Sequence, residues 1–317
     1  MNKRTMTIKS FLIPGILLLV GLIILVALPF YAPIYAVILL STIFMYIVLT
    51  SSWALFSGPT GQLSLATAAF FGVGIYIAAF LGNNMPLLVV VLIGGLVSAC
   101  LALLVGGLTL RLKGVYFAIF TFGLLELMKH LLLFIEIKFI GTRGRFVVVV
   151  DYDTVYFYML AVLVLTLLTS FLLRRSKFGL ALQSIGEQEE AAEHIGINVT
   201  LVKVSAFAIS AFFIGAAGTI MATRWTYIDP YIAFNMEFSF TPVLMAIVGG
   251  MGQLYGPVIG ATIFAYLEEQ LITKFPYYYM LVFGIILVIS VLYLPNGLVG
   301  LIQKLRIRIK GGENAHS

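Results

Sequence analysis

The residues whose side chains could do chemistry are few in this chain and far apart in the sequence. Its three histidines, His130, His194 and His316, are too scattered to suggest a metal site. Cys100 is the only cysteine and lies inside an apolar run, which leaves no intrachain disulfide and no cysteine-based metal site. Paired-carboxylate and nucleophile–base motifs are also missing. We therefore expect a protein that is not an enzyme and that binds no metal or cofactor of its own.

Two pairs of ionisable residues stand out within apolar runs, where a charge is costly and usually has a function. Glu126 and Lys129 are three residues apart, so they can pair on one helix. A structural ion pair is our preferred interpretation, and a role in ion-coupled transport is the alternative. Glu268 and Glu269 fall near the outer end of a helix, from which we expect them to reach the membrane interface.

One segment, residues 176–196, is acidic and polar and is set between two long apolar runs. On a helix, its apolar face would carry Phe178, Leu182, Ile185 and Ala192. The opposite face would carry Glu187, Glu190, Glu193 and His194. Gly179 and Gly186 each weaken a helix by about 1 kcal/mol. We therefore predict a short helix that breaks near Gly186 and ends at Gly196 as its C-cap. A solvated connector is the alternative to a docking element.

The overall composition is that of a membrane protein. Mean hydropathy is +1.11, and 62% of the 317 residues are hydrophobic while 10% are charged. Apolar runs of about 20 residues recur, each long enough to cross about 30 Å of hydrocarbon as a helix. Alternating strands of the barrel type are not seen. The fold class is therefore all-α, a polytopic helical membrane protein.

We expect about ten transmembrane helices in a single domain over residues 1–317, with a loop at about 174–199 outside the bilayer. The expected spans are about 11–30, 34–56, 61–81, 86–107, 115–136, 155–173, 200–222, 238–249, 255–272 and 277–294. The span at 238–249 is short, so a re-entrant helix is the alternative to a crossing.

The formal net charge of +6 fits a membrane protein better than a nucleic-acid partner, because lysine and arginine cluster at the ends of apolar runs. With both termini in the cytoplasm, the 176–196 segment is cytoplasmic as well. The basic residues on that side would be Arg111, Lys113, Arg174, Arg175, Lys177, Lys304, Arg306, Arg308 and Lys310. Those on the outer side would be Arg143, Arg145 and Arg224.

Several short motifs follow one another in a fixed order from about Trp53 to the tail. They lie at 61–65, 70–76, 111–119, 186–187 with 190–192 and Gly196, Lys203 with 206–207, 215–218, and 249–252 with 256–261. In this order the chain resembles the permeases of bacterial branched-chain amino acid ABC importers, in particular the larger permease subunit. The same family includes permeases for urea and short amides, so the solute stays open.

The resemblance implies that the 176–196 segment couples the permease to a separate ATPase. The residues implied in that contact are Gly179, Gly186, Glu187, Glu190, Ala191, Ala192 and Gly196. The sequence agrees, because it contains no G-x-x-x-x-G-K-[ST] loop to hold nucleotide phosphates. ATP and Mg²⁺ would bind to two ATPase subunits. A second related permease, as a heterodimer, and an extracytoplasmic solute-binding protein would complete the assembly in the bacterial inner membrane.

A weakly polar path suits a leucine-like solute, which combines an apolar side chain with a zwitterionic head. The candidate polar residues of such a path are Gln62, Ser64, Thr121, Ser210, Ser239 and Thr241. Hydrogen bonding between helices is the alternative role for each of them.

Overall fold

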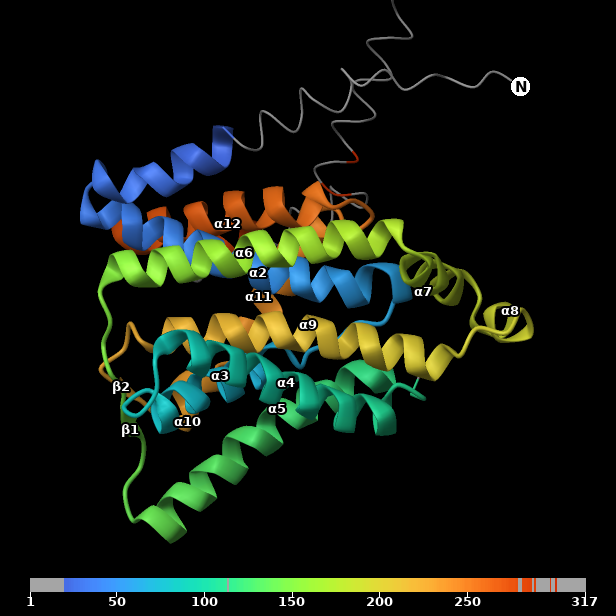
Figure 1. Ribbon diagram of the computed structural model, residues 1–317, viewed down its shortest axis with the longest axis horizontal. Helices are drawn as coiled ribbons and strands as arrows, with labels where there is room; N and C mark the ends of the chain where they lie inside the picture. Colours follow the sequence, from blue (N-terminus) through green and yellow to red (C-terminus); the bar gives the residue numbers. More distant parts are fainter. Residues whose placement is uncertain are drawn as a thin grey trace, which may run out of the picture.

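The computed structural model describes residues 20–112, 114–278 and 281–286, together with residues 288, 297 and 300. These residues form a helical bundle with one antiparallel pair of two-residue strands (Figure 1). In chain order the elements are η1 (Leu28–Phe30), α2 (Ile34–Thr60), α3 (Thr67–Leu81), α4 (Leu87–Thr109), α5 (Val115–Ile135), η2 (Glu136–Ile140), β1 (Arg145–Phe146), α6 (Tyr152–Arg175), α7 (Lys177–Glu187), α8 (Glu189–His194), α9 (Val199–Ala222), β2 (Tyr227–Ile228), α10 (Pro230–Ala233), α11 (Glu237–Gly249) and α12 (Tyr255–Lys274).

Six stretches of the described chain are long and apolar enough to cross a membrane as helices. They are Ile34–Thr60, Leu87–Thr109, Val115–Ile140, Tyr152–Arg175, Val199–Ala222 and Pro230–Gly249. Val20–Phe30 and α3 are shorter apolar helices. The all-α, polytopic class is therefore confirmed. The expected spans 11–30 and 277–294 lie partly outside the described residues, and Lys113 and the basic tail lie wholly outside them.

Helix α9 lies at the centre of the bundle, in contact with α3 and α4. A Cβ atom at Gly74 would overlap the carbonyl oxygen of Gly215, and one at Gly94 would overlap the hydroxyl of Thr219. The Thr219 hydroxyl donates a hydrogen bond of 3.0 Å to the Gly74 carbonyl. Glycines let helices approach closely in lipid, where packing rather than the hydrophobic effect holds them together.

Aromatic rings join α9 to its other neighbours. The ring of Phe207 on α9 lies 5.0 Å from that of Phe56 on α2 and 5.2 Å from that of Phe70 on α3. All three side chains are buried. Tilted and edge-on ring pairs at this separation are favourable beyond the area they bury. Helices α2, α3 and α9 therefore form one packed unit.

The expected helix over 61–81 begins later than predicted, because residues 61–66 have a non-helical backbone. Gly61 has φ 66°, which ends α2 in a left-handed cap. The indole N–H of Trp53 then donates to the Ser64 carbonyl at 2.7 Å. Such backbone is tolerated at membrane depth only where protein surrounds it, and Ser64 is 3% exposed. Tertiary hydrogen bonds here replace the helical ones.

The end of the bundle that carries β1, β2 and α10 lies opposite α7 and α8 (Figure 1). The three arginines expected there each have partners. Arg143 forms an ion pair of 2.6 Å with Asp229, and the guanidinium of Arg145 lies 3.9 Å from the ring centre of Phe80. Arg224 donates a hydrogen bond of 2.9 Å to Thr42 of α2. These contacts give the arginines at this end a structural role.

We expect Gly74→Val to lower the free energy of unfolding by about 1–3 kcal/mol or more, because the added branch overlaps the Gly215 carbonyl. The measurement is the thermal midpoint of the purified protein in detergent. Gly123→Val on α5 is the matched control, since a Cβ there meets open space. Equal midpoints for the two variants would contradict the packing described for α9.

Candidate functional site

Helices α7 and α8 form a small projection beyond the ends of α6 and α9 (Figure 1). The Ser176 hydroxyl caps α7 by accepting a hydrogen bond from the backbone N–H of Gly179 at 3.3 Å. Leu182 and Ile185 are buried, and Phe178 is half-buried. The predicted apolar face of this segment is therefore confirmed, and it rests on the bundle.

The two glycines of α7 are points of close contact rather than helix breaks. A Cβ atom at Gly179 would overlap the carbonyl oxygen of Leu173 on α6, and one at Gly186 would overlap that of Pro59 on α2. Both glycines thus let α7 lie directly on neighbouring backbone. The break predicted near Gly186 is confirmed and lies at Gln188, whose extended backbone (φ −157°) separates α7 from α8.

Helix α8 ends as the sequence predicts. Gly196 has φ 90°, its N–H bonds the Glu193 carbonyl at 2.9 Å, and the Ile197 N–H bonds the Ala192 carbonyl at 3.1 Å. This pair of bonds is the Schellman arrangement, which satisfies carbonyls that the helix end leaves free. Gly196 is therefore confirmed as the glycine that ends the helix, directly after the C-cap residue Ile195.

An ion pair joins α8 to α9. The Lys203 ammonium lies 2.9 Å from a carboxylate oxygen of Glu189, and the Lys203 side chain is 2% exposed. A buried charge without a partner is strongly destabilising, so this pair fixes α8 against α9. Sequence reasoning missed Glu189. The signal was Lys203 itself, a lone cation near the start of an apolar run, which requires a carboxylate nearby.

The outer face of α7 and α8 is acidic and open. Its exposed residues include Glu187, Glu190, Ala191, Glu193, His194 and Gly196. Among the implied coupling residues, Gly179 and Ala192 are instead buried against the bundle. The coupling residues that the resemblance implies thus fall into two groups. The inward group attaches α7 and α8 to the bundle, and the outward group is available to a partner.

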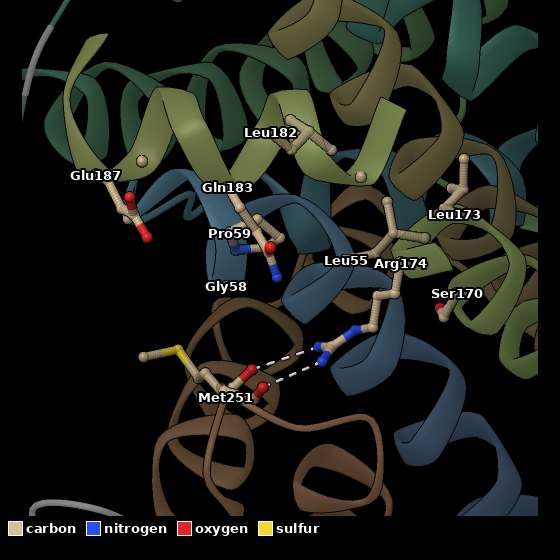
Figure 2. A pocket seen from close by; sticks show the side chains of 14 residues that line it. Leu55, Gly58, Pro59, Ser170, Leu173, Arg174, Leu182, Gln183, Glu187 and Met251 are labelled. Carbon is tan, nitrogen blue, oxygen red and sulfur yellow. Dashed lines mark hydrogen bonds between the residues drawn. The ribbon is translucent and has the colours of Figure 1, made fainter. Parts of the chain in front are cut away.

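A cavity of about 420 Å³ lies between α7 and the ends of α2 and α6 (Figure 2). The Arg174 guanidinium crosses it and donates hydrogen bonds to the carbonyls of Gly252 at 3.2 Å and Met251 at 3.4 Å. Gln183 and Glu187 extend from α7 towards the same side. The cavity is lined by Leu55, Gly58, Pro59, Gly61, Ser170, Leu173, Arg174, Gly179, Leu182, Gln183, Gly186, Glu187, Met251 and Gly252.

Two of the candidate path residues hold the non-helical segment 61–66 in place. The Thr121 hydroxyl accepts a hydrogen bond of 2.9 Å from the Leu65 N–H. The Ser239 hydroxyl accepts one from Ala68 N–H at 3.0 Å and donates one to the Leu65 carbonyl at 2.8 Å. The alternative role of hydrogen bonding between segments is thus the one these two residues have here.

The six candidate path residues are all buried in the part of the chain that the structure describes. They are Gln62, Ser64, Thr121, Ser210, Ser239 and Thr241. Ser64 and Ser210 meet at a void of about 10 Å³, which is room for about one water molecule. A solute path along these residues stays a prediction.

The predicted pairing of Glu126 and Lys129 is confirmed, with 2.6 Å between the carboxylate and the ammonium. One buried carboxylate, Glu136, was not singled out from the sequence. It is 1% exposed and accepts hydrogen bonds from the Tyr76 hydroxyl at 3.1 Å and the Gly144 N–H at 2.9 Å. Its place at the end of an apolar helix gave no separate signal.

The expectation that Glu268 reaches the membrane interface is wrong. Its side chain is buried, with the residue 7% exposed, and one carboxylate oxygen has no hydrogen-bond partner among the described residues. Helix α12 packs on α2 and α11, which turns Glu268 inward. Glu269 is less buried and accepts a hydrogen bond of 3.4 Å from the Tyr35 hydroxyl.

Residues 35–291 match the family model described as the permease component of branched-chain amino acid transport systems. The high-affinity branched-chain amino acid permease protein LivM of Salmonella typhimurium is 28% identical over 92% of this chain and 76% of its own length. LivM of Escherichia coli is 28% identical over 96% of this chain and 81% of its own length.

A xylose transport system permease protein of Haemophilus influenzae, XylH, is 33% identical, but over only 38% of this chain and 33% of its own length. No solved structure matches the chain significantly. The family model, in contrast, spans most of the bundle, from α2 past α12. The chain therefore belongs to the family of branched-chain amino acid transport system permease components.

Proposed function

We propose that this chain is the membrane-spanning permease subunit of an ATP-driven importer and forms half of its pore for leucine, isoleucine and valine. Membership of the family supports branched-chain amino acids as the solute. Urea or short amides are the alternative. The observation that carries the proposal is the α7–α8 projection. It is attached firmly to α2, α6 and α9 while its acidic outer face is left open.

The outer face of α7 and α8 would dock into a groove of an ATPase subunit, one of two that bind ATP and Mg²⁺. Movement of that subunit would then reach the bundle at two points. At one, Gly186 lies on the Pro59 carbonyl of α2. At the other, Glu189 holds Lys203 of α9. Because α2 packs directly on α9, the two contacts would move the same group of helices together.

A second, related permease would supply the other half of the pore, as a heterodimer. The burial of the six candidate path residues supports this arrangement, as does the void of about 10 Å³ beside Ser64 and Ser210, which cannot hold leucine. A path between two permeases avoids that limit. A solute-binding protein would deliver leucine at the opposite end, where β1, β2 and α10 lie.

The end that carries α7 and α8 would face the cytoplasm of a bacterium, with the protein in the inner membrane and both termini inside. Arg174, Arg175 and Lys177 lie at this end, as the positive-inside bias requires. The arginines at the other end are paired or stacked, so they do not oppose this orientation.

The energy source of uptake distinguishes the proposed ATP-driven import from ion-coupled transport. We expect uptake of labelled leucine into proteoliposomes to require ATP and the ATPase subunits. Uptake should continue when the proton and sodium gradients are collapsed at constant ATP, because the sequence points to a separate ATPase and Glu126 is already paired with Lys129. Uptake that disappears with the gradients while ATP is unchanged would refute the proposal.

The outer face of α8 is tested by Glu190→Lys and Gly196→Asp. Glu190→Lys reverses the charge offered to the ATPase. Gly196→Asp forces a Cβ into a left-handed position at a cost of about 1–2 kcal/mol, although its Cβ meets no other atom. We expect both variants to insert normally and to lose ATPase association or leucine uptake.

Glu193→Lys is the matched control for this pair of variants, because it makes the same charge reversal on α8 outside the implied coupling positions. We expect it to be milder than Glu190→Lys. The measurements are co-purification of the ATPase and the uptake rate. Wild-type association and uptake in all three variants would mean that the 176–196 segment is only a connector.

A further inference from the structure

Of the six membrane-length stretches in the described chain, the one that contains α5 is the least buried, and α5 lies at the edge of the bundle (Figure 1). In its most apolar part 17% of the residues are buried, compared with 61% for α2 and for α9. One face of this stretch is exposed along its whole length. Its exposed residues recur at helical spacing and include Tyr116, Ile119, Leu127, His130, Phe134 and Ile137. This face therefore lies against lipid or against something outside this chain.

Ionisable groups lie near the middle of this exposed face. At 1.5 Å per residue, Glu126 and His130 lie about 17–23 Å from the start of a stretch about 38 Å long. The side chain of His130 is 62% exposed and that of Glu126 is 30% exposed. Ionisable groups at this depth are costly in lipid and nearly always face protein or a water-filled cavity. The face therefore indicates a neighbour other than lipid.

The ion pair in this cluster does not join α5 to another helix. Glu126 and Lys129 both belong to α5, and His130 lies 3.6 Å from the second carboxylate oxygen of Glu126. The Lys129 ammonium also lies 5.8 Å from the ring centre of Tyr231 on α10. A pair within one helix adds little to stability. Helix packing therefore does not explain why three ionisable groups lie together at this depth.

We propose that the exposed face of α5 lines the path between this permease and the second one, and that Glu126, Lys129 and His130 bind the charged head of the amino acid as it crosses. The inference rests on the proposed function for the second permease and for the solute. The head carries one charge of each sign, as the ion pair does. Its ammonium bonds to Glu126, and its carboxylate bonds to His130 with Lys129 close by. Leu127 and Phe134, one turn away on either side of His130, offer apolar contacts to the branched side chain.

Thiol labelling of the complete transporter in proteoliposomes tests where this face lies. A charged, membrane-impermeant thiol reagent is present on both sides of the membrane. His130→Cys in a Cys100→Ala background should react, because a path for amino acids contains water and a thiol reacts as its thiolate.

Leu165→Cys on α6, in the same background, is the matched control. Leu165 is 52% exposed near the middle of its helix, and α6 and α5 lie on opposite sides of α9 in Figure 1. We expect this position to face lipid and to stay unreactive. A lack of reaction at His130→Cys, or equal reaction at both positions, would overturn the inference.

Binding of the head is tested by the double variant Glu126→Gln with Lys129→Met. It removes both charges without leaving either one unpaired, so the thermal midpoint and the co-purification of the ATPase should stay near wild type. ATP-driven uptake of labelled leucine should fall about tenfold or more, as expected when charge-assisted hydrogen bonds to the head are lost.

Uptake by this double variant at the wild-type rate would overturn the inference and leave the proposed function intact. A loss of uptake that only matches a loss of assembled transporter would also overturn it, because the pair would then be structural. Absence of ATP-driven uptake by the wild type would instead remove the proposed function, and with it the role of the cluster in binding leucine. That result is seen before any variant is measured.

Discussion

The close contact of α9 with α3 and α4 is the constraint on which the rest of the structure depends. At Gly74, Gly94 and Gly215 there is no room for a side chain, so the three helices meet nearly backbone to backbone. In lipid this kind of packing replaces the hydrophobic effect as the force that holds helices together. Helix α9 is thus tightly packed along its length and connects the α7–α8 end to the opposite end of the bundle (Figure 1).

The α7–α8 element is attached to α9 by an ion pair and to α2 by close backbone packing. Replacing a buried ion pair with apolar residues is often neutral for stability, whereas removing one partner costs about 3–5 kcal/mol. The pair of Lys203 with Glu189 is thus better explained by position than by stability, because it fixes where α8 stands on α9. The contact of Gly186 with Pro59 fixes α7 on α2 in the same way.

The sequence was sufficient for features that depend on local chemistry. Hydropathy predicts the helices, the spacing of Leu182 and Ile185 predicts the buried face of α7, and Gly196 predicts the end of α8. The sequence was insufficient where contacts between residues far apart in the chain determine the backbone conformation or the direction of a side chain. Residues 61–66 lose their helix to bonds from remote side chains, and Glu268 turns inward because of the helices that cover it. The close contacts of Gly179 and Gly186 were likewise not predicted, since their partners lie on other helices.

The central claim is that α8 moves α9 through the pair of Glu189 with Lys203. The most direct test is the ratio of leucine transported to ATP hydrolysed by the complete transporter, measured for Glu189→Met, Lys203→Met and the double variant. We predict the lowest ratio for Glu189→Met, which strands a buried ammonium, and a partial recovery in the double variant, which buries two apolar side chains instead. Wild-type ratios in all three variants, with normal ATPase association, would contradict the claim.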